Sequence, residues 1–202
     1  MSETPQAFGD LPAAQQQDVH ALSATLVRAS LNAANKVSQE WGELPDHVAM
    51  SDIIHFTIRT EMLLFLMHMV SRYAFIEFGD AVRTKLQDAL VEVTLPTYIE
   101  TSFGNSTSEW RANMLSALLH HLREAEMDYK RCTALLDESD PTTDDSVVTT
   151  LAYRVTVPLQ MDDAIVTLSL IRVGLGTLVE TDLKKRVQAL GMSLAASGVR
   201  SG

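Results

Sequence analysis

The chain has 202 residues, of which 46% are hydrophobic and 21% are charged; this balance is typical of globular proteins and excludes an intrinsically disordered one. The formal net charge of −10 disfavours nonspecific binding to nucleic acids and to anionic membrane surfaces, because both are negatively charged. A chain of this length forms one generous domain or two small ones. We expect a single helical domain over residues 1–202, with a disordered N-terminal tail at 1–10 and a frayed tail at 197–202.

The first helix is predicted to begin near Asp10, which can cap it, and to end at Gly42 and Pro45. Pro12 suits the first turn, where a missing N–H costs nothing. Apolar residues three and four apart draw one stripe along this helix, namely Val19, Leu22, Leu26, Ala29 and Ala33. The opposite face carries few charges, so it can be solvated or can lie against another chain.

A second helix is predicted from about Ser51 to Phe78, where Gly79 breaks the pattern. A third helix is predicted to follow as far as about Thr94, because Pro96 is expected to stop it.

A long helix is predicted over residues 107–138, starting at a capping box formed by Ser106 and Glu109. Its apolar stripe consists of Trp110, Met114, Leu118, Leu122, Ala125, Tyr129, Cys132 and Leu136. The acidic stretch "DESDPTTDD" that follows is predicted to be a solvated linker, with Thr142 and Asp145 as a further capping box.

Residues 147–173 are compatible with two kinds of structure. Seven of the eleven residues from Val147 to Val157 are β-branched, which is typical of a strand and would allow a β-hairpin turning at "QMDD". Val148, Leu151 and Val155 also fit one helix face, and the helical surroundings favour that alternative. With a last helix over about 181–196, the sequence predicts a mainly α, multi-helix bundle of about five to seven helices, with a possible β-hairpin within 147–173.

Three polar residues interrupt the apolar run "EMLLFLMHMVSRYAF" of the second helix. At 100° per residue, His68 and Arg72 both lie within about 20° of Glu61, so all three share one face. A buried charge needs a partner, and His68 is too far along the helix to serve Glu61. We therefore expect Glu61 to find its partner on another helix. The three residues are either a polar ligand pocket, or structural groups satisfied by neighbours or by a dimer partner.

The helix at 107–138 supplies the second half of such a pocket. His121 and Glu124 are three residues apart, which is the spacing of metal-binding residues in di-iron bundles. Their order is reversed, however, and the chain has no second copy of the motif. The candidate ligand-binding residues are Glu61, His68, Arg72, His121 and Glu124. A single metal held by four of them is conceivable, but the sequence predicts no metal ion and no cofactor.

The other motifs are weak. Gly174 and Gly176 lack the third glycine of a dinucleotide-binding loop, so they indicate a helix break or close packing. Cys132 is the one cysteine, and its place in an apolar stripe is typical of an inert buried thiol. The lack of a disulfide and of a signal-peptide pattern at the N-terminus favours a cytoplasmic location.

The sequence therefore predicts a homo-oligomeric interaction or assembly protein, a homodimer being the expected form, without catalytic activity. The alternative is a bundle that binds a small ligand or a metal in a polar pocket between the helices at 51–78 and 107–138. No catalytic motif supports an enzyme, and the acidic charge disfavours a nucleic-acid or membrane partner.

Overall fold

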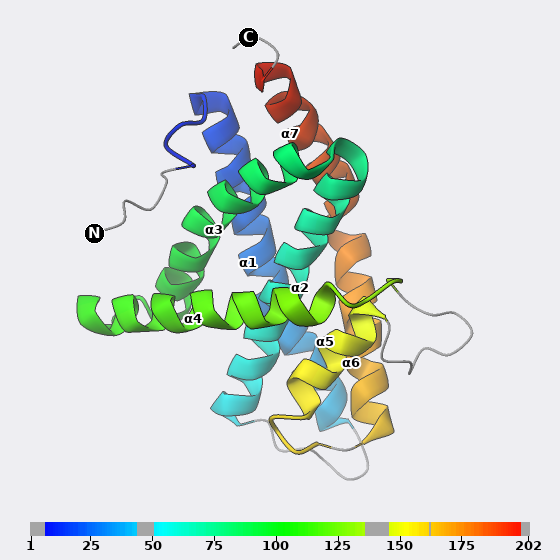
Figure 1. Ribbon diagram of the computed structural model, residues 1–202. Helices are drawn as coiled ribbons and strands as arrows, with labels where there is room; N and C mark the ends of the chain where they lie inside the picture. Colours follow the sequence, from blue (N-terminus) through cyan, green and yellow to red (C-terminus); the bar gives the residue numbers. More distant parts are fainter. Residues whose placement is uncertain (1–6, 44–50, 136–145, 162, 199–202) are drawn as a thin grey trace. The chain divides into compact units, whose positions relative to one another are not determined.

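A computed structural model of the chain describes residues 7–43, 51–135, 146–161 and 163–198 (Figure 1). Within these ranges the chain forms seven helices: α1 (Ala13–Gly42), α2 (Asp52–Phe78), α3 (Asp80–Phe103), α4 (Ser108–Tyr129), α5 (Val147–Thr156), α6 (Ala164–Thr181) and α7 (Leu183–Gly198). The predicted mainly α, multi-helix bundle is confirmed. The acidic linker with its second capping box lies outside the described residues.

The helices are divided between two compact units. Unit 1 comprises Met1–Val27, Met67–His121 and Asp182–Gly202, and unit 2 comprises Arg28–Leu66 and Leu122–Thr181. Because α1, α2 and α4 each contribute residues to both units, the two units are described separately.

In unit 1, α3 packs against α7. The side-chain amide of Gln15 on α1 donates to the carbonyl oxygen of Ser193 on α7 at 2.9 Å. At the start of the chain, the backbone N–H groups of Ala7 and Phe8 donate to the carboxylate of Glu92 at 2.9 and 3.0 Å. These bonds hold residues 7 and 8 against α3.

In unit 2, α5 and α6 lie side by side, as the yellow and orange helices of Figure 1 show. Gly174 allows the close approach, since a Cβ atom there would lie 2.9 Å from a methyl group of Leu151. The close-packing interpretation of this glycine is thus confirmed. The second half of α1 runs antiparallel to α6, because Lys36 pairs with Glu180 while Glu40, further along α1, pairs with Arg172.

The first two helices begin and end close to the predicted residues. The predicted apolar stripe of α1 is buried along its whole length. Ser51 caps α2, because its hydroxyl oxygen accepts the N–H of Ile54 at 3.3 Å. At the other end of α2, Gly79 has a φ of 78°, a conformation that glycine adopts without strain.

The prediction that Pro96 stops the third helix is wrong, because α3 continues through it to Phe103. Proline removes one backbone donor from a helix, which costs about 3 kcal/mol in a helix interior. The residues around it offset this cost, since Leu95, Tyr98 and Ile99 are all buried. Here tertiary packing overrides the local preference.

The fourth helix is shorter than predicted at its C-terminal end. It starts after Thr107, whose hydroxyl accepts the N–H of Trp110, and it stops at Tyr129 instead of residue 138. Beyond it, the carbonyl oxygens of Ala134 and Leu135 accept the N–H groups of Val147 and Val148. These carbonyls therefore serve the first turn of α5 instead of extending α4.

The possible β-hairpin within 147–173 is wrong. Ser146 caps α5 through its hydroxyl oxygen, which accepts the N–H of Thr149 at 3.1 Å. The buried face of α5 includes Val148, Leu151 and Val155, as the helical alternative predicts. No strand forms in the ranges that the structure describes, because burial of β-branched residues such as Val148 and Val155 outweighs their preference for a strand.

Two helices, α2 and α6, are long and apolar enough to cross a membrane by length and composition alone. In the structure, 67% of the most apolar window of α2 is buried, against 50% for α6. A high buried share is what the core helix of a bundle shows. The other half of α6 is exposed or half-buried.

Candidate functional site

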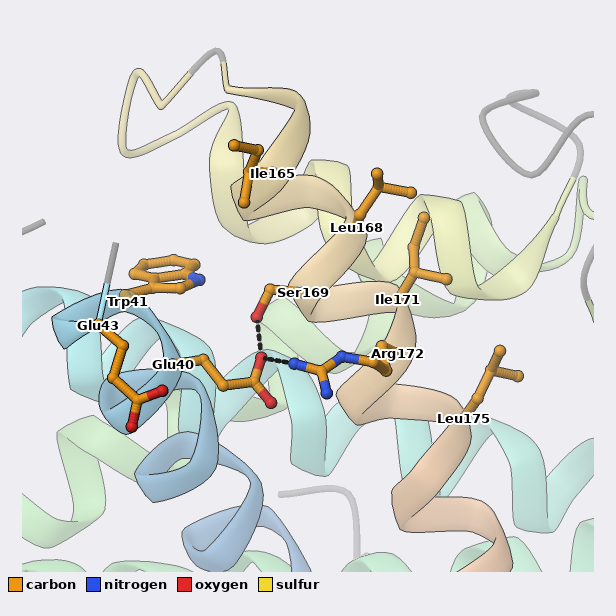
Figure 2. Close-up of a pocket in the computed structure, with 9 residues that line it drawn as sticks. All are labelled: Glu40, Trp41, Glu43, Ile165, Leu168, Ser169, Ile171, Arg172 and Leu175. Atoms are coloured by element: carbon orange, nitrogen blue, oxygen red, sulfur yellow. Dashed lines mark hydrogen bonds and ion pairs between the residues drawn. The ribbon is translucent and has the colours of Figure 1, made fainter. Parts of the chain in front are cut away.

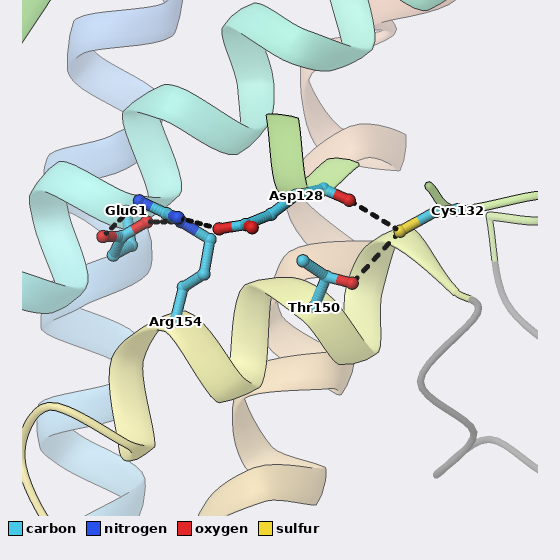
Figure 3. Close-up of polar contacts among 5 residues, drawn as sticks. All are labelled: Glu61, Asp128, Cys132, Thr150 and Arg154. Atoms are coloured by element: carbon cyan, nitrogen blue, oxygen red, sulfur yellow. Dashed lines mark hydrogen bonds and ion pairs between the residues drawn. The ribbon is translucent and has the colours of Figure 1, made fainter. Parts of the chain in front are cut away.

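Glu61 is buried on α2 in unit 2, and its partner is Arg154 of α5. The guanidinium Nε of Arg154 donates to Glu61 Oε2 at 2.7 Å, and Nη2 lies 3.3 Å from Oε1 (Figure 3). Only 3% of the Glu61 side chain and 11% of the Arg154 side chain are exposed. The expectation that Glu61 takes its partner from another helix is therefore confirmed.

The same guanidinium also binds Asp128 at the end of α4, through Nη1. Figure 3 shows Arg154 lying between the two carboxylates, so that it ties α2, α4 and α5 together. Burial alone would lower the pKa of Arg154, but Glu61 and then Asp128 raise it above its ordinary value. The three charged side chains therefore balance one another within unit 2. The carboxylate of Glu61, which was predicted to bind a ligand, is already paired with Arg154.

Tyr129 lies in the same region and is fully buried. Burial, followed by the negative charge of Glu61, raises the pKa of the Tyr129 phenol well above its ordinary value, with Arg154 opposing the shift. Cys132 is also buried close by, where its sulfur lies 3.1 Å from the hydroxyl of Thr150. These groups are typical of a structural polar cluster and fit the prediction of a buried thiol.

The other four predicted ligand residues are divided between the units. His68 and Arg72 belong to unit 1, with the imidazole buried and the guanidinium half-buried. His121, half-buried, is in unit 1, and Glu124 is exposed in unit 2. Their role in binding a ligand stays a prediction. Among the described residues, no three His, Cys, Asp or Glu side chains are grouped to hold a metal ion.

A groove in unit 2 was not anticipated from the sequence. It has a volume of about 720 Å³ and runs between the end of α1 and one side of α6. Glu40 and Trp41 line it from the end of α1, and Glu43 lines it from the turn just beyond. The α6 wall consists of Ile165, Leu168, Ser169, Ile171, Arg172 and Leu175 (Figure 2).

The polar centre of the groove is Glu40. Its Oε2 atom accepts the hydroxyl of Ser169 and pairs with Arg172 Nη2 at 2.6 Å (Figure 2). Its other oxygen, Oε1, accepts no hydrogen bond from the described part of the chain. Arg172 is 71% exposed, so most of its donors face solvent. The groove therefore carries a carboxylate and a guanidinium that each have capacity for a further partner.

The outer face of α6 is apolar where a surface helix is normally polar. The residues at 165, 168, 172, 175 and 179 follow spacings of three and four, so they form one stripe. Ile165 is 55% exposed, Leu168 49% and Val179 79%, while Leu175 is half-buried. We call these five residues the α6 stripe; Arg172 is its one charged member.

The three-and-four spacing of the α6 stripe is present in the sequence, but a second pattern overlaps it. Residues 164–173 also read as alternating apolar and polar, which is typical of a strand, and this pattern hid the three-and-four spacing of a helix. Trp41 and Glu40 gave no comparable signal, because only tertiary packing places the end of α1 beside α6. Arg154 likewise could not be paired with Glu61 from sequence spacing.

Comparisons of the chain with protein-family models, with curated proteins and with solved structures each found no match. What can be inferred about function therefore comes from the residues and their geometry.

Proposed function

We propose that the protein is a homo-oligomeric assembly protein that associates through the α6 stripe. The observation that carries the proposal is the exposure of Ile165, Leu168 and Val179 on a helix whose other face is already buried. Contiguous exposed apolar surface marks a binding site for a protein, a membrane or a ligand, whereas single scattered apolar residues do not. A helix that is apolar all round is stable where both faces are covered.

Spacings of three and four are the pattern by which two helices interlock side chains. The neighbouring groove, with Leu168 and Leu175 on its α6 wall, offers space for side chains from a second helix. Such a helix would lie along α6, which is how amphipathic helices bind apolar grooves. We also propose that the protein is located in the cytoplasm.

A small apolar ligand in the same groove is the second candidate. The groove volume of about 720 Å³ falls within the range typical of ligand sites, roughly 300–1,000 Å³. This candidate differs from the polar pocket predicted between the helices at 51–78 and 107–138. There Glu61 is paired with Arg154, and binding of a ligand by that pocket stays a prediction.

Native mass spectrometry of the purified full chain tests both candidates in one measurement. The proposal expects a dimer or higher multiple of the 22.3 kDa chain, without added mass. A monomer at every concentration up to about 100 μM would overturn it, since a functional assembly needs a Kd below that range. A monomer that retains a small molecule would favour the ligand candidate in its place.

A further inference from the structure

The α6 stripe is nearly symmetrical about its middle residue. Arg172 is its middle residue, with Leu168 and Leu175 on either side and Ile165 and Val179 at the two ends. Ile165 and Val179 each lie seven residues from Arg172, and Leu168 and Leu175 lie four and three residues from it, so a reversed copy centred on Arg172 brings apolar residues within about one residue's rise of apolar residues. A surface that complements itself in this way suits a two-fold dimer, in which residue i contacts j and j contacts i.

We infer that two copies pair antiparallel along α6, with the two-fold axis passing close to Arg172. Ile165 of one copy then lies near Val179 of the other, and Leu168 lies near Leu175. This inference rests on the proposed self-association and adds the partner's orientation to it.

Charge also favours a second copy as the occupant. An antiparallel pair brings the two Arg172 side chains towards each other, which would be unfavourable without anions nearby. Each copy supplies one, because Glu40 holds its own Arg172 through Oε2, while its Oε1 accepts no hydrogen bond from the described residues. Arg172 of each copy can therefore bind the partner's Glu40 as well. Two acids and two bases then meet near the axis with no net charge.

The same ion pair disfavours a membrane as the occupant. Although α6 is apolar enough to enter lipid, the stripe would carry Arg172 and its neighbour Glu40 into the hydrocarbon region. A charged side chain there costs at least about 2.5 kcal/mol. The net charge of −10 also opposes approach to an anionic bilayer.

Spin labels at the ends of α6 measure the orientation directly. Ala164 and Glu180 are exposed, and each lies eight residues from Arg172. In the antiparallel pair, two labels at Ala164 are separated by roughly 24 Å along the axis, while labels at Ala164 and Glu180 on different copies are close. The experiment uses Ala164→Cys and Glu180→Cys in the full chain with Cys132→Ser, and measures distances by pulsed electron paramagnetic resonance.

The expected result is a long distance for the Ala164→Cys protein and a short one when it is mixed with the Glu180→Cys protein. A dimer with a short distance between the two Ala164 labels would overturn the antiparallel inference and leave self-association standing. A dimer with only long distances would place the interface elsewhere and overturn the role of α6. A protein that is monomeric by mass would remove the basis of both proposals.

Charge reversal checks the contact at the axis without labels. Arg172→Glu leaves four acids and no base near the axis, and Glu40→Arg leaves four bases, so each variant alone is expected to dissociate. An equimolar mixture of the two variants should restore the dimer, because each copy supplies the opposite charge. Lys130→Glu, an exposed reversal in the same unit, is the control and should associate like the parent. Failure of the mixture to associate, with the parent dimeric, would contradict the cross-copy contact.

Discussion

Arg154 illustrates how one residue stabilises unit 2. It joins two carboxylates from different helices, and its partner Glu61 is almost completely buried. Removing one member of such a pair leaves the other as an uncompensated buried charge, which is the costly event.

The polar character of Glu61 was visible in the sequence, but its partner was not. Position 154 lies in a stretch that fits a strand as well as a helix, and no spacing rule connects it to 61.

Arg154→Ala is therefore expected to lower the free energy of unfolding by about 3–5 kcal/mol. Lys36→Ala, which removes an exposed ion pair with Glu180, should cost at most about 1 kcal/mol. Urea denaturation of both variants, followed by circular dichroism, provides the comparison. Equal small effects would show that the ion network in unit 2 is dispensable.

The pH dependence of stability follows from Tyr129. Its pKa is raised in the folded protein, while the unfolded chain keeps an ordinary value near 10. The unfolded state therefore loses this proton first, and stability that is complete below pH 10 falls as the pH rises towards the folded pKa. Tyr129→Phe, which cannot ionise, should show a smaller loss between pH 9 and pH 11 than the parent protein.

Tyr153→Phe is the matched control for this experiment, because Tyr153 is 36% exposed. Its loss of stability over the same pH interval should match that of the parent. If the Tyr129→Phe protein followed the same curve as the parent, ionisation of the buried phenol would not contribute to alkaline unfolding.

At the scale of helices, replacing glycine by alanine is expected to have opposite effects on stability at two positions. A Cβ atom at Gly191 of α7 would lie 2.5 Å from Cδ2 of the Phe78 ring, whereas one at Gly176 of α6 meets nothing within 4 Å. Gly191→Ala should destabilise the protein by about 1–3 kcal/mol through overpacking. Gly176→Ala should stabilise it by about 0.5–1 kcal/mol, since alanine favours a helix.

Thermal unfolding of the two alanine variants checks this pair. In a Phe78→Leu background, where the ring is absent, the penalty of Gly191→Ala should shrink. An unchanged penalty in that background would mean that the ring does not cause it.

The helices themselves show where sequence reasoning succeeds. A cap and a breaker located α2 well, because Ser51 and Gly79 act through bonds and dihedral angles within a few residues. The apolar stripe located α1, because every residue of that stripe is buried. The same reasoning failed at Pro96 and at the end of α4. In both places the deciding interactions come from residues distant in sequence: burial of the flanking side chains in the first case, and hydrogen bonds to the start of α5 in the second.

For the whole molecule, net charge opposes the association of two copies, while exposed apolar surface favours it. The net charge of −10 keeps copies apart, while the α6 stripe presents exposed apolar side chains with one internally paired charge. Association depends on burial at the stripe exceeding this repulsion. Burying one leucine contributes about 1.5–3 kcal/mol, so a charge at Leu168 is expected to raise the dimer Kd more than tenfold.

Sedimentation velocity over a concentration series tests this account most directly, with the parent, Leu168→Glu and Met127→Glu compared in one buffer. Met127 is 57% exposed on α4, so its variant adds the same charge away from the stripe. The account predicts a dimer for the parent and for Met127→Glu, and a folded monomer for Leu168→Glu. A parent that sediments as a monomer, or a Leu168→Glu protein that dimerises as tightly as the parent, would contradict it.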